Sequence, residues 1–176
     1  MKKVCIILVV LFGVFIIARS FELVRPFKNS LLGMVPSLNA DDLIVMEGVS
    51  YHLKKPRRGD IIVFKTEGIP SCSPGQHGVK RVVGEPGEKI RIQNGKVVIN
   101  GEEILIENKA GIIKYMPLSE KSESENIEIP RQCYYVLGDN SSHSFDSRMI
   151  GVVPEKNIIG KVFLRYWPLN QAGFIK

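Results

Sequence analysis

Lys80 has an apolar neighbour on its own face of a predicted strand, as a desolvated base needs. It lies in the apolar run VKRVVG, residues 79–84, whose β-like alternation places Lys80 on one face with Val82 and Arg81 on the other. A lysine with an ordinary pKa near ~10.4 is protonated at neutral pH, but burial among apolar groups lowers that pKa and leaves the amine able to accept a proton. The alternative is a solvent-exposed lysine on an amphipathic strand, because most lysines are exposed.

Two further segments contain glycines, hydroxyls and charged residues in short clusters. The first is a bend before the predicted strands, Gly33-Met34-Val35-Pro36-Ser37-Leu38. The other follows a β-like run and is the third segment in chain order. It consists of Gly138-Asp139-Asn140, then Ser144, then Asp146-Ser147-Arg148 and Gly151. The second segment in chain order lies between these two and begins with Lys80. Its sequence is KRVVGEPGE, residues 80–88.

Together and in this order, the three segments resemble those of the type I signal peptidase family, which are membrane-anchored serine proteases that remove signal peptides from exported preproteins. The resemblance covers nearly the whole chain, from the N-terminal apolar segment through Arg58-Gly59-Asp60-Ile61 to Arg165-Tyr166-Trp167-Pro168. One segment alone is a weak signal, whereas the three together are highly specific. The resemblance implies a Ser/Lys dyad on an all-β domain.

The resemblance also implies a role for individual residues. In the family the first segment is Ser-Met-x-Pro-Thr-Leu and its Ser is the nucleophile, which puts the nucleophile position at Gly33. The lysine that opens the second segment is the general base, here Lys80, and a serine of the third segment holds its amine, here Ser144. The remaining site residues that we expect by resemblance are Asp139, Asp146 and Arg148 as supporting residues, and Met34 and Pro36 as substrate-binding residues.

This sequence departs from the family at the nucleophile. Gly33 has no side chain, and Leu31 stands where the family often has a second hydroxyl that helps to bind the oxyanion. Deletion of the nucleophile lowers turnover about 10⁶-fold in a well-studied Ser/His protease, so we expect peptidase activity to be lost or severely reduced. Ser30 and Ser37 are poor substitutes, because a displacement of about 1 Å already removes much of the catalytic geometry.

The elements that must position these residues are short β-strands. From residue 42 onward, Val- and Ile-rich runs alternate with turn residues, and no segment beyond residue 20 has a helical apolar repeat. Asn94-Gly95 and Asn100-Gly101 each predict a two-residue hairpin. The sequence therefore predicts an all-β, antiparallel sheet domain with a polar surface excursion at Ser119–Ile129. The predicted strands are 42–46, 60–65, 79–84, 88–93, 96–99, 134–137 and 161–167.

The N-terminal segment is the one long apolar run of the sequence. Lys2 and Lys3 precede the apolar residues 4–18, and Arg19 ends the run. As a helix this run spans about 22 Å at ~1.5 Å per residue, which is short for a bilayer. Two interpretations remain open, a signal peptide cleaved after Ser20 or an uncleaved transmembrane helix whose Lys and Arg stems reach the headgroups.

We expect residues 1–20 to be a membrane anchor and residues 21–176 to be an exported β domain. The protein would then be a single-pass protein of a bacterial cell membrane, with the bulk of the chain on the extracytoplasmic side. Its expected partners are the signal peptides of exported preproteins, the lipid bilayer and an active homologue. The functions that remain as alternatives are a membrane-anchored binder that does not cut, and a secreted binding protein.

Composition and charge exclude several classes of protein. The 176 residues are 44% hydrophobic and 24% charged, which excludes a disordered chain and a multi-span transporter. The net charge of +6 comes from scattered residues and indicates a lipid surface rather than nucleic acid. Cys72 and Cys133 either pair or remain thiols, and with His77 and His143 they match no compact metal-ligand pattern. We expect neither a metal nor a cofactor.

Overall fold

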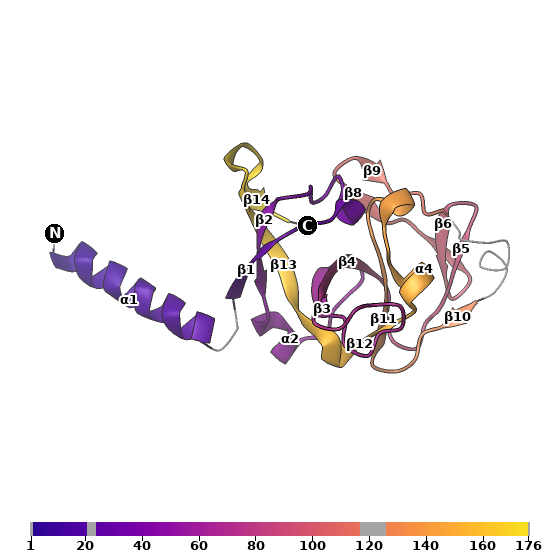
Figure 1. The fold of residues 1–176 in the computed structure, drawn as a ribbon, viewed down its shortest axis with the longest axis horizontal. Helices are drawn as coiled ribbons and strands as arrows, with labels where there is room; N and C mark the ends of the chain where they lie inside the picture. Colours follow the sequence, from indigo (N-terminus) through magenta and orange to yellow (C-terminus); the bar gives the residue numbers. More distant parts are fainter. Residues whose placement is uncertain (1, 21–23, 117–125, 176) are drawn as a thin grey trace.

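A helix leads into a set of antiparallel β-sheets in this chain (Figure 1). The structure, a computed structural model, describes residues 2–20, 24–116 and 126–175. Every strand pairing within these ranges is antiparallel, which confirms the predicted fold class.

The main sheet carries the strand that contains Lys80. Its strand order is β1-β2-β13-β3-β4-β11-β12, and β14 pairs with β13 at the side of this path. β4 therefore lies between β3 and β11, inside the sheet rather than at an edge. The bounds are β1 Val24–Lys28, β2 Leu43–Glu47, β3 Ile61–Lys65, β4 His77–Gly84, β11 Cys133–Leu137, β12 Val153–Pro154, β13 Ile158–Trp167 and β14 Gly173–Phe174.

The smaller sheets contain both predicted hairpins. β5 and β6 pair so that Gln93 faces Lys96, and Asn94 between them has a φ of 50°. β6 and β7 likewise pair around a turn in which Asn100 has a φ of 52°. These positive φ angles are what a two-residue hairpin turn demands, and both hairpin predictions are confirmed. One smaller sheet has the strand order β10-β5-β6-β7, and the other is the pair β8-β9. The bounds are β5 Lys89–Gln93, β6 Lys96–Ile99, β7 Glu102–Ile104, β8 Glu107–Asn108, β9 Gly111–Ile112 and β10 Ile127–Glu128.

Short helical turns connect the strands and were not predicted from the sequence. They have three to five residues each, too few for an apolar repeat to be visible. Asp146 caps one of them by accepting a hydrogen bond from the backbone N–H of Arg148. The α-helical turns are α2 Val49–Leu53 and α4 Ser147–Ile150, and the 3₁₀ turns are η1 Leu32–Met34, η2 Ser141–His143, η3 Glu155–Asn157 and η4 Leu169–Gln171.

The core covers both faces of β4. Val82 packs in a cluster with Ile62 and Phe64, whereas Val83 packs in a different cluster with Ile90. The period-2 alternation predicted for this strand thus places its two sets of side chains in two separate cores. Since both faces are covered, no residue from position 80 to 84 is exposed.

The N-terminal helix α1, Lys2–Ser20, extends away from the sheets (Figure 1). Within the described residues no helix combines the length and the apolar character that crossing a membrane requires. The transmembrane helix predicted for residues 1–20 is therefore not confirmed.

Two other predictions concern loops and thiols. Most of the polar excursion predicted at Ser119–Ile129 lies outside the described residues, and its described end includes β10, which pairs with β5. Cys72 and Cys133 are both free thiols, so the alternative of a disulfide between them is wrong.

Candidate active site

The bend at η1 brings Gly33 against the amine of Lys80. A Cβ added to Gly33 would lie 3.3 Å from the Lys80 Nζ atom and 3.3 Å from the Ser144 Oγ atom. The φ angle of Gly33 lies outside the left-handed region, so its backbone accepts an L side chain without strain. The three positions predicted to form the catalytic centre are therefore neighbours in the structure.

Lys80 is a buried lysine. Only 4% of the residue is exposed, so a solvent-exposed lysine on an amphipathic strand is excluded. Its Nζ donates to the backbone carbonyl of Val79 at 3.1 Å. Burial lowers the pKa of the Lys80 amine, and the nearby carboxylates of Asp146 and Asp139 only partly oppose this effect. A lowered pKa makes the neutral amine, the form that can accept a proton, more accessible near neutral pH.

Ser144 lies just after η2 with its hydroxyl buried. The residue is 4% exposed, and its Oγ atom has no hydrogen-bond partner among the described residues. A buried hydroxyl without a partner is uncommon in folded proteins, and a functional role is one of its explanations. We call the position that a Cβ atom on Gly33 would take the Cβ point of Gly33. The Ser144 Oγ atom lies 3.3 Å from this point, as expected for a group beside the reacting atoms.

Gly138 lets the segment after β11 pack against the bend. A Cβ at this position would come within 2.0 Å of the Ser144 Oγ atom and 2.3 Å of the Gly33 carbonyl oxygen. The turn at Asn140 also contacts the bend, because the backbone N–H of Asn140 donates a hydrogen bond to the Gly33 carbonyl at 3.0 Å. The Asn140 side chain donates to the Leu32 carbonyl at 3.2 Å.

A buried ion pair joins β4 to the segment after β11. Arg81 donates to Asp139 through two nitrogens, at 2.8 and 2.7 Å, and both side chains are at most 3% exposed. The Ser37 hydroxyl donates to the same carboxylate and so ties the first segment to this pair. The Ser37 hydroxyl is therefore hydrogen-bonded to Asp139, which agrees with the prediction that Ser37 is a poor substitute nucleophile.

A second ion pair organises the turn that contains Ser144. Arg148 donates to Asp146 through two nitrogens, each at 2.8 Å, and the Asp146 side chain is fully buried. Asp146 also accepts from the Gly138 backbone N–H at 2.9 Å. Arg148 donates in addition to the Ser141 carbonyl at 2.7 Å, so the two ends of the loop are held together.

Two cavities share Lys80 as a lining residue. One of about 370 Å³ is lined by Gly33, Met34 and Lys80 among others. The second, of about 170 Å³, contains Cys72 in its wall. Met34 is also part of the core beneath the bend, whereas Pro36 is exposed and lines neither cavity. The residues common to both walls are Leu31, Gln76, His77 and Lys80.

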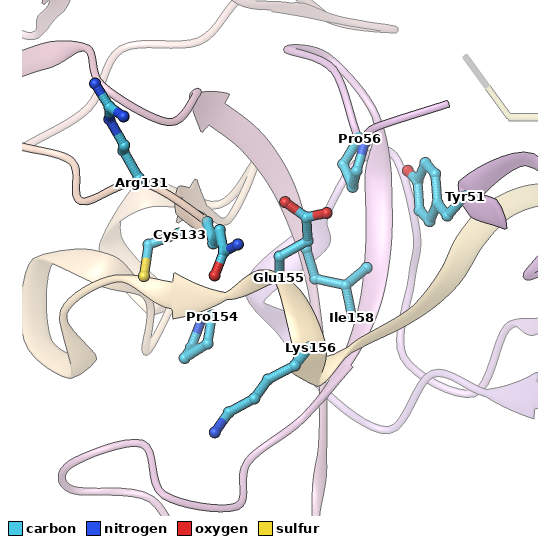
Figure 2. Close-up of a pocket in the computed structure, with 9 residues that line it drawn as sticks. Tyr51, Pro56, Arg131, Cys133, Pro154, Glu155, Lys156 and Ile158 are labelled. Atoms are coloured by element: carbon cyan, nitrogen blue, oxygen red, sulfur yellow. The ribbon is translucent and has the colours of Figure 1, made fainter. Parts of the chain in front are cut away.

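A larger cavity of about 610 Å³ lies elsewhere on the main sheet (Figure 2). It has no lining residue in common with the two cavities beside Lys80. The side chains of Arg131 and Lys156 point away from its centre, and Glu155 is paired with Lys55 at 3.1 Å. This arrangement does not form a charged ligand site.

Three residues that hold the site together had no role in the sequence prediction. Arg81, Ser37 and Asn140 connect the bend, β4 and the segment after β11 through the contacts described above. Each lies inside a quoted segment, and the sequence signal was its adjacency to a predicted site residue. What the sequence did not show was which hydrogen bonds hold the three segments together.

Comparisons with known proteins identify the family of this chain. A family model described as signal peptidase, peptidase S26, matches residues 1–167. A signal peptidase I of Leptolyngbya laminosa is 40% identical over 143 residues, which cover 80% of this chain and 67% of that protein. The probable signal peptidase I-2 of Synechocystis sp. is 34% identical over 143 residues, which cover 81% of this chain and 62% of that protein.

A solved structure belongs to the same group of proteins. The crystal structure of a signal peptidase I from Enterococcus faecalis V583 matches with a TM-score of 0.45 at 31% identity, and the match covers 61% of this chain and 97% of that chain. This chain spans about two thirds of the length of the two curated relatives named above.

Proposed function

Because this chain belongs to the signal peptidase family, peptidase S26, we propose that it binds the signal peptides of exported preproteins beside Lys80 and cleaves them extremely slowly. The observation that carries the proposal is the position of Gly33. Its Cβ point lies 3.3 Å from both the Lys80 amine and the Ser144 hydroxyl, so the dyad geometry is kept while the attacking oxygen is missing.

The base is retained in a working state. Lys80 is buried and its pKa is lowered, which is what a general base for a hydroxyl needs. The ion pairs Arg81–Asp139 and Arg148–Asp146 keep the segments around it in place. We therefore assign Lys80 as the base, Ser144 as the residue that orients its amine, and the two ion pairs as support.

Two cavities beside Lys80 offer space for the side chains of a bound peptide. The cavities that share Lys80 have volumes of about 370 and 170 Å³, and the smaller one is lined by residues such as Phe64 and Phe145. Leu31 borders both cavities and adds apolar surface where the family often has a hydroxyl. An extended peptide with small residues before its cleavage point, the pattern at the end of a signal peptide, is the substrate class that we propose.

We further propose that residues 1–20 anchor the chain in a bacterial cell membrane by a single helix, with residues 21–176 on the extracytoplasmic side. The support is the apolar run at residues 4–18, bounded by Lys2, Lys3 and Arg19. Long basic side chains at the ends of a short apolar helix reach the headgroup region and compensate for its length. Signal peptides, the bilayer and an active homologue remain the proposed partners.

The proposal is tested with a synthetic peptide that carries an Ala-x-Ala cleavage sequence. We expect the full-length chain to bind the peptide in a fluorescence anisotropy titration and to leave it intact over times in which an active signal peptidase I completes the reaction. The Lys80→Ala variant serves as the control for chemistry, because it removes the base and leaves the other lining residues of both cavities in place. Rapid cleavage by the unmodified chain that disappears in Lys80→Ala would contradict the proposed loss of turnover, and absence of binding would contradict the proposed binding function.

A further inference from the structure

Gly33 and Lys80 border the same cavity. Both residues line the cavity of about 370 Å³, so this cavity reaches from the Gly33 backbone to Lys80. The Lys80 Nζ atom lies 3.3 Å from the Cβ point of Gly33, and the Ser144 Oγ atom, which has no partner among the described residues, lies 3.3 Å from the same point. Of these two atoms, only the Lys80 amine belongs to a residue that lines the cavity.

A polar wall and sufficient volume are the two conditions for a buried water site. An ordered water needs about 10–15 Å³ of accessible volume and at least two polar partners. The Cβ point itself lies at bonding distance from the Gly33 Cα atom, so a water oxygen must lie further into the cavity. Lys80 lines the same cavity together with other polar residues, among them Ser30, Gln76 and His77.

We propose that Lys80 activates a water molecule at this place, so that the chain hydrolyses a bound peptide slowly in a single step without a covalent intermediate. The inference rests on the proposed function, because it needs the peptide to be bound beside Lys80. It adds the nucleophile that the proposed function leaves open.

The chemistry of the step balances with water as the only co-reactant. The water oxygen forms a bond to the peptide carbonyl carbon while one of its protons passes to the neutral Lys80 amine. The carbonyl electron pair moves to the carbonyl oxygen. When the tetrahedral adduct collapses, the C–N bond breaks and the Lys80 ammonium returns the proton to the leaving amine. The products are one peptide with a new carboxylate and one with a new amine.

The hydroxyls of the chain are poorly placed to replace water. The Ser37 hydroxyl donates to Asp139, whose carboxylate is held by Arg81. Arg81 follows Lys80 on β4, and side chains of consecutive strand residues point to opposite faces. The Ser144 hydroxyl is buried and not exposed to the cavity, since its Oγ atom has almost no accessible surface. Lys80 lines the cavity, so a water molecule in the cavity lies beside this residue.

The test compares single-site variants with the Ala-x-Ala peptide, using the full-length chain in excess over the peptide and long incubations. Lys80→Ala removes the base and should lower the slow hydrolysis by about 100-fold or more, the lower end of what general base catalysis contributes. Gly33→Ala adds a methyl group 3.3 Å from the Lys80 Nζ atom and excludes water from that approach. We expect it to lower the rate about 100-fold as well, since displacement of a reacting atom by ~1 Å has that effect. Lys89→Ala, a change at an exposed lysine of β5, is the matched control and should leave the rate unchanged.

A second measurement identifies the nucleophile. After acid quench, mass spectrometry of the unmodified chain should show no acyl adduct, whereas Gly33→Ser should form one on residue 33. An adduct on any serine of the unmodified chain would overturn the inference, because a hydroxyl would then replace the water. Equal rates in the unmodified chain, Gly33→Ala and Lys80→Ala would also overturn it.

Peptide binding measured in the same samples separates the two proposals. If the peptide binds but hydrolysis does not depend on Lys80, only the water mechanism fails. If the peptide does not bind, the proposed function fails, and the water mechanism fails with it.

Discussion

At the scale of single residues, Lys80 shows how burial prepares a base. The residue is 4% exposed in a core strand, and burial lowers the pKa of its amine. The pKa of this amine is lowered although position 33, where the family has its nucleophilic serine, is a glycine. Under the proposed function, any remaining chemistry depends on this amine.

Replacement of Lys80 by methionine should stabilise the fold. The pKa of Lys80 is lower in the folded than in the unfolded state, so the folded state binds fewer protons between these two pKa values and stability rises with pH in that window. The penalty is fully present below the folded pKa and disappears above the ordinary value near ~10.4. Lys80→Met removes it, so we expect a larger free energy of unfolding in urea at neutral pH and a flatter pH dependence.

The matched control for this change is Lys89→Met, which replaces an exposed lysine of β5. Surface substitutions usually change stability by no more than about 0.5 kcal/mol. A Lys80→Met variant that is no more stable than the Lys89→Met variant would contradict the buried state of the amine.

The sequence predicted much of the environment of Lys80. The alternation around Lys80 predicted apolar neighbours on its own face, and the resemblance supplied Gly33 and Ser144 as its partners. The structure decided between a buried and an exposed lysine, because that choice depends on which strands cover the second face of β4. The unpartnered Ser144 hydroxyl was not predictable, since it depends on the close approach of Gly138.

At the scale of elements, the ion pair between Arg81 on β4 and Asp139 after β11 links two segments of the site. Both side chains are at most 3% exposed, and Ser37 of the bend donates to the same carboxylate. Removing one partner of a buried pair leaves an uncompensated charge and typically lowers stability by about 3–5 kcal/mol. We expect this loss for Asp139→Ala in urea or thermal unfolding.

Glu103→Ala is the comparison for this prediction. It breaks the Lys96–Glu103 pair, whose side chains are at least 50% exposed. Exposed pairs contribute about 0–1 kcal/mol, so the loss should be small. Equal destabilisation by Asp139→Ala and Glu103→Ala would show that the Arg81–Asp139 pair does not hold the segments together.

The elements were predicted with unequal success. The two Asn-Gly hairpins were visible because a two-residue turn requires residues that accept a positive φ. The two-residue strands and the single-turn helices were missed, because they are too short to carry a periodic pattern and form only where the tertiary structure supplies partners.

At the scale of the whole molecule, the chain combines a β domain that carries the site with an N-terminal helix. The apolar residues 4–18 predict a membrane anchor, and we expect the intact chain to stay in the membrane fraction after an alkaline wash. Leu11→Arg should release a large part of it, because an arginine near the centre of a spanning helix costs about 2.5–3.5 kcal/mol. Recovery of a soluble form that lacks residues 1–20 would instead indicate a cleaved signal peptide.

The whole-molecule prediction was good for fold class and weaker for arrangement. The turn spacing and Val/Ile-rich runs predicted an antiparallel all-β domain, which the sheets confirm. The order of strands, in which β13 near the C-terminus lies between β2 and β3, was not predictable, because that pairing is formed between distant parts of the sequence.

The most direct test restores the missing hydroxyl. In the Gly33→Ser variant the new Cβ atom meets the Lys80 Nζ and Ser144 Oγ atoms at 3.3 Å, so small shifts of these side chains accommodate it. We predict that this variant cleaves the Ala-x-Ala peptide orders of magnitude faster than the unmodified chain, up to about 10⁶-fold, and that adding Lys80→Ala abolishes the gain. A Gly33→Ser variant that cleaves no faster than Gly33→Ala would contradict the account, because the base and the bend would then not form a working site.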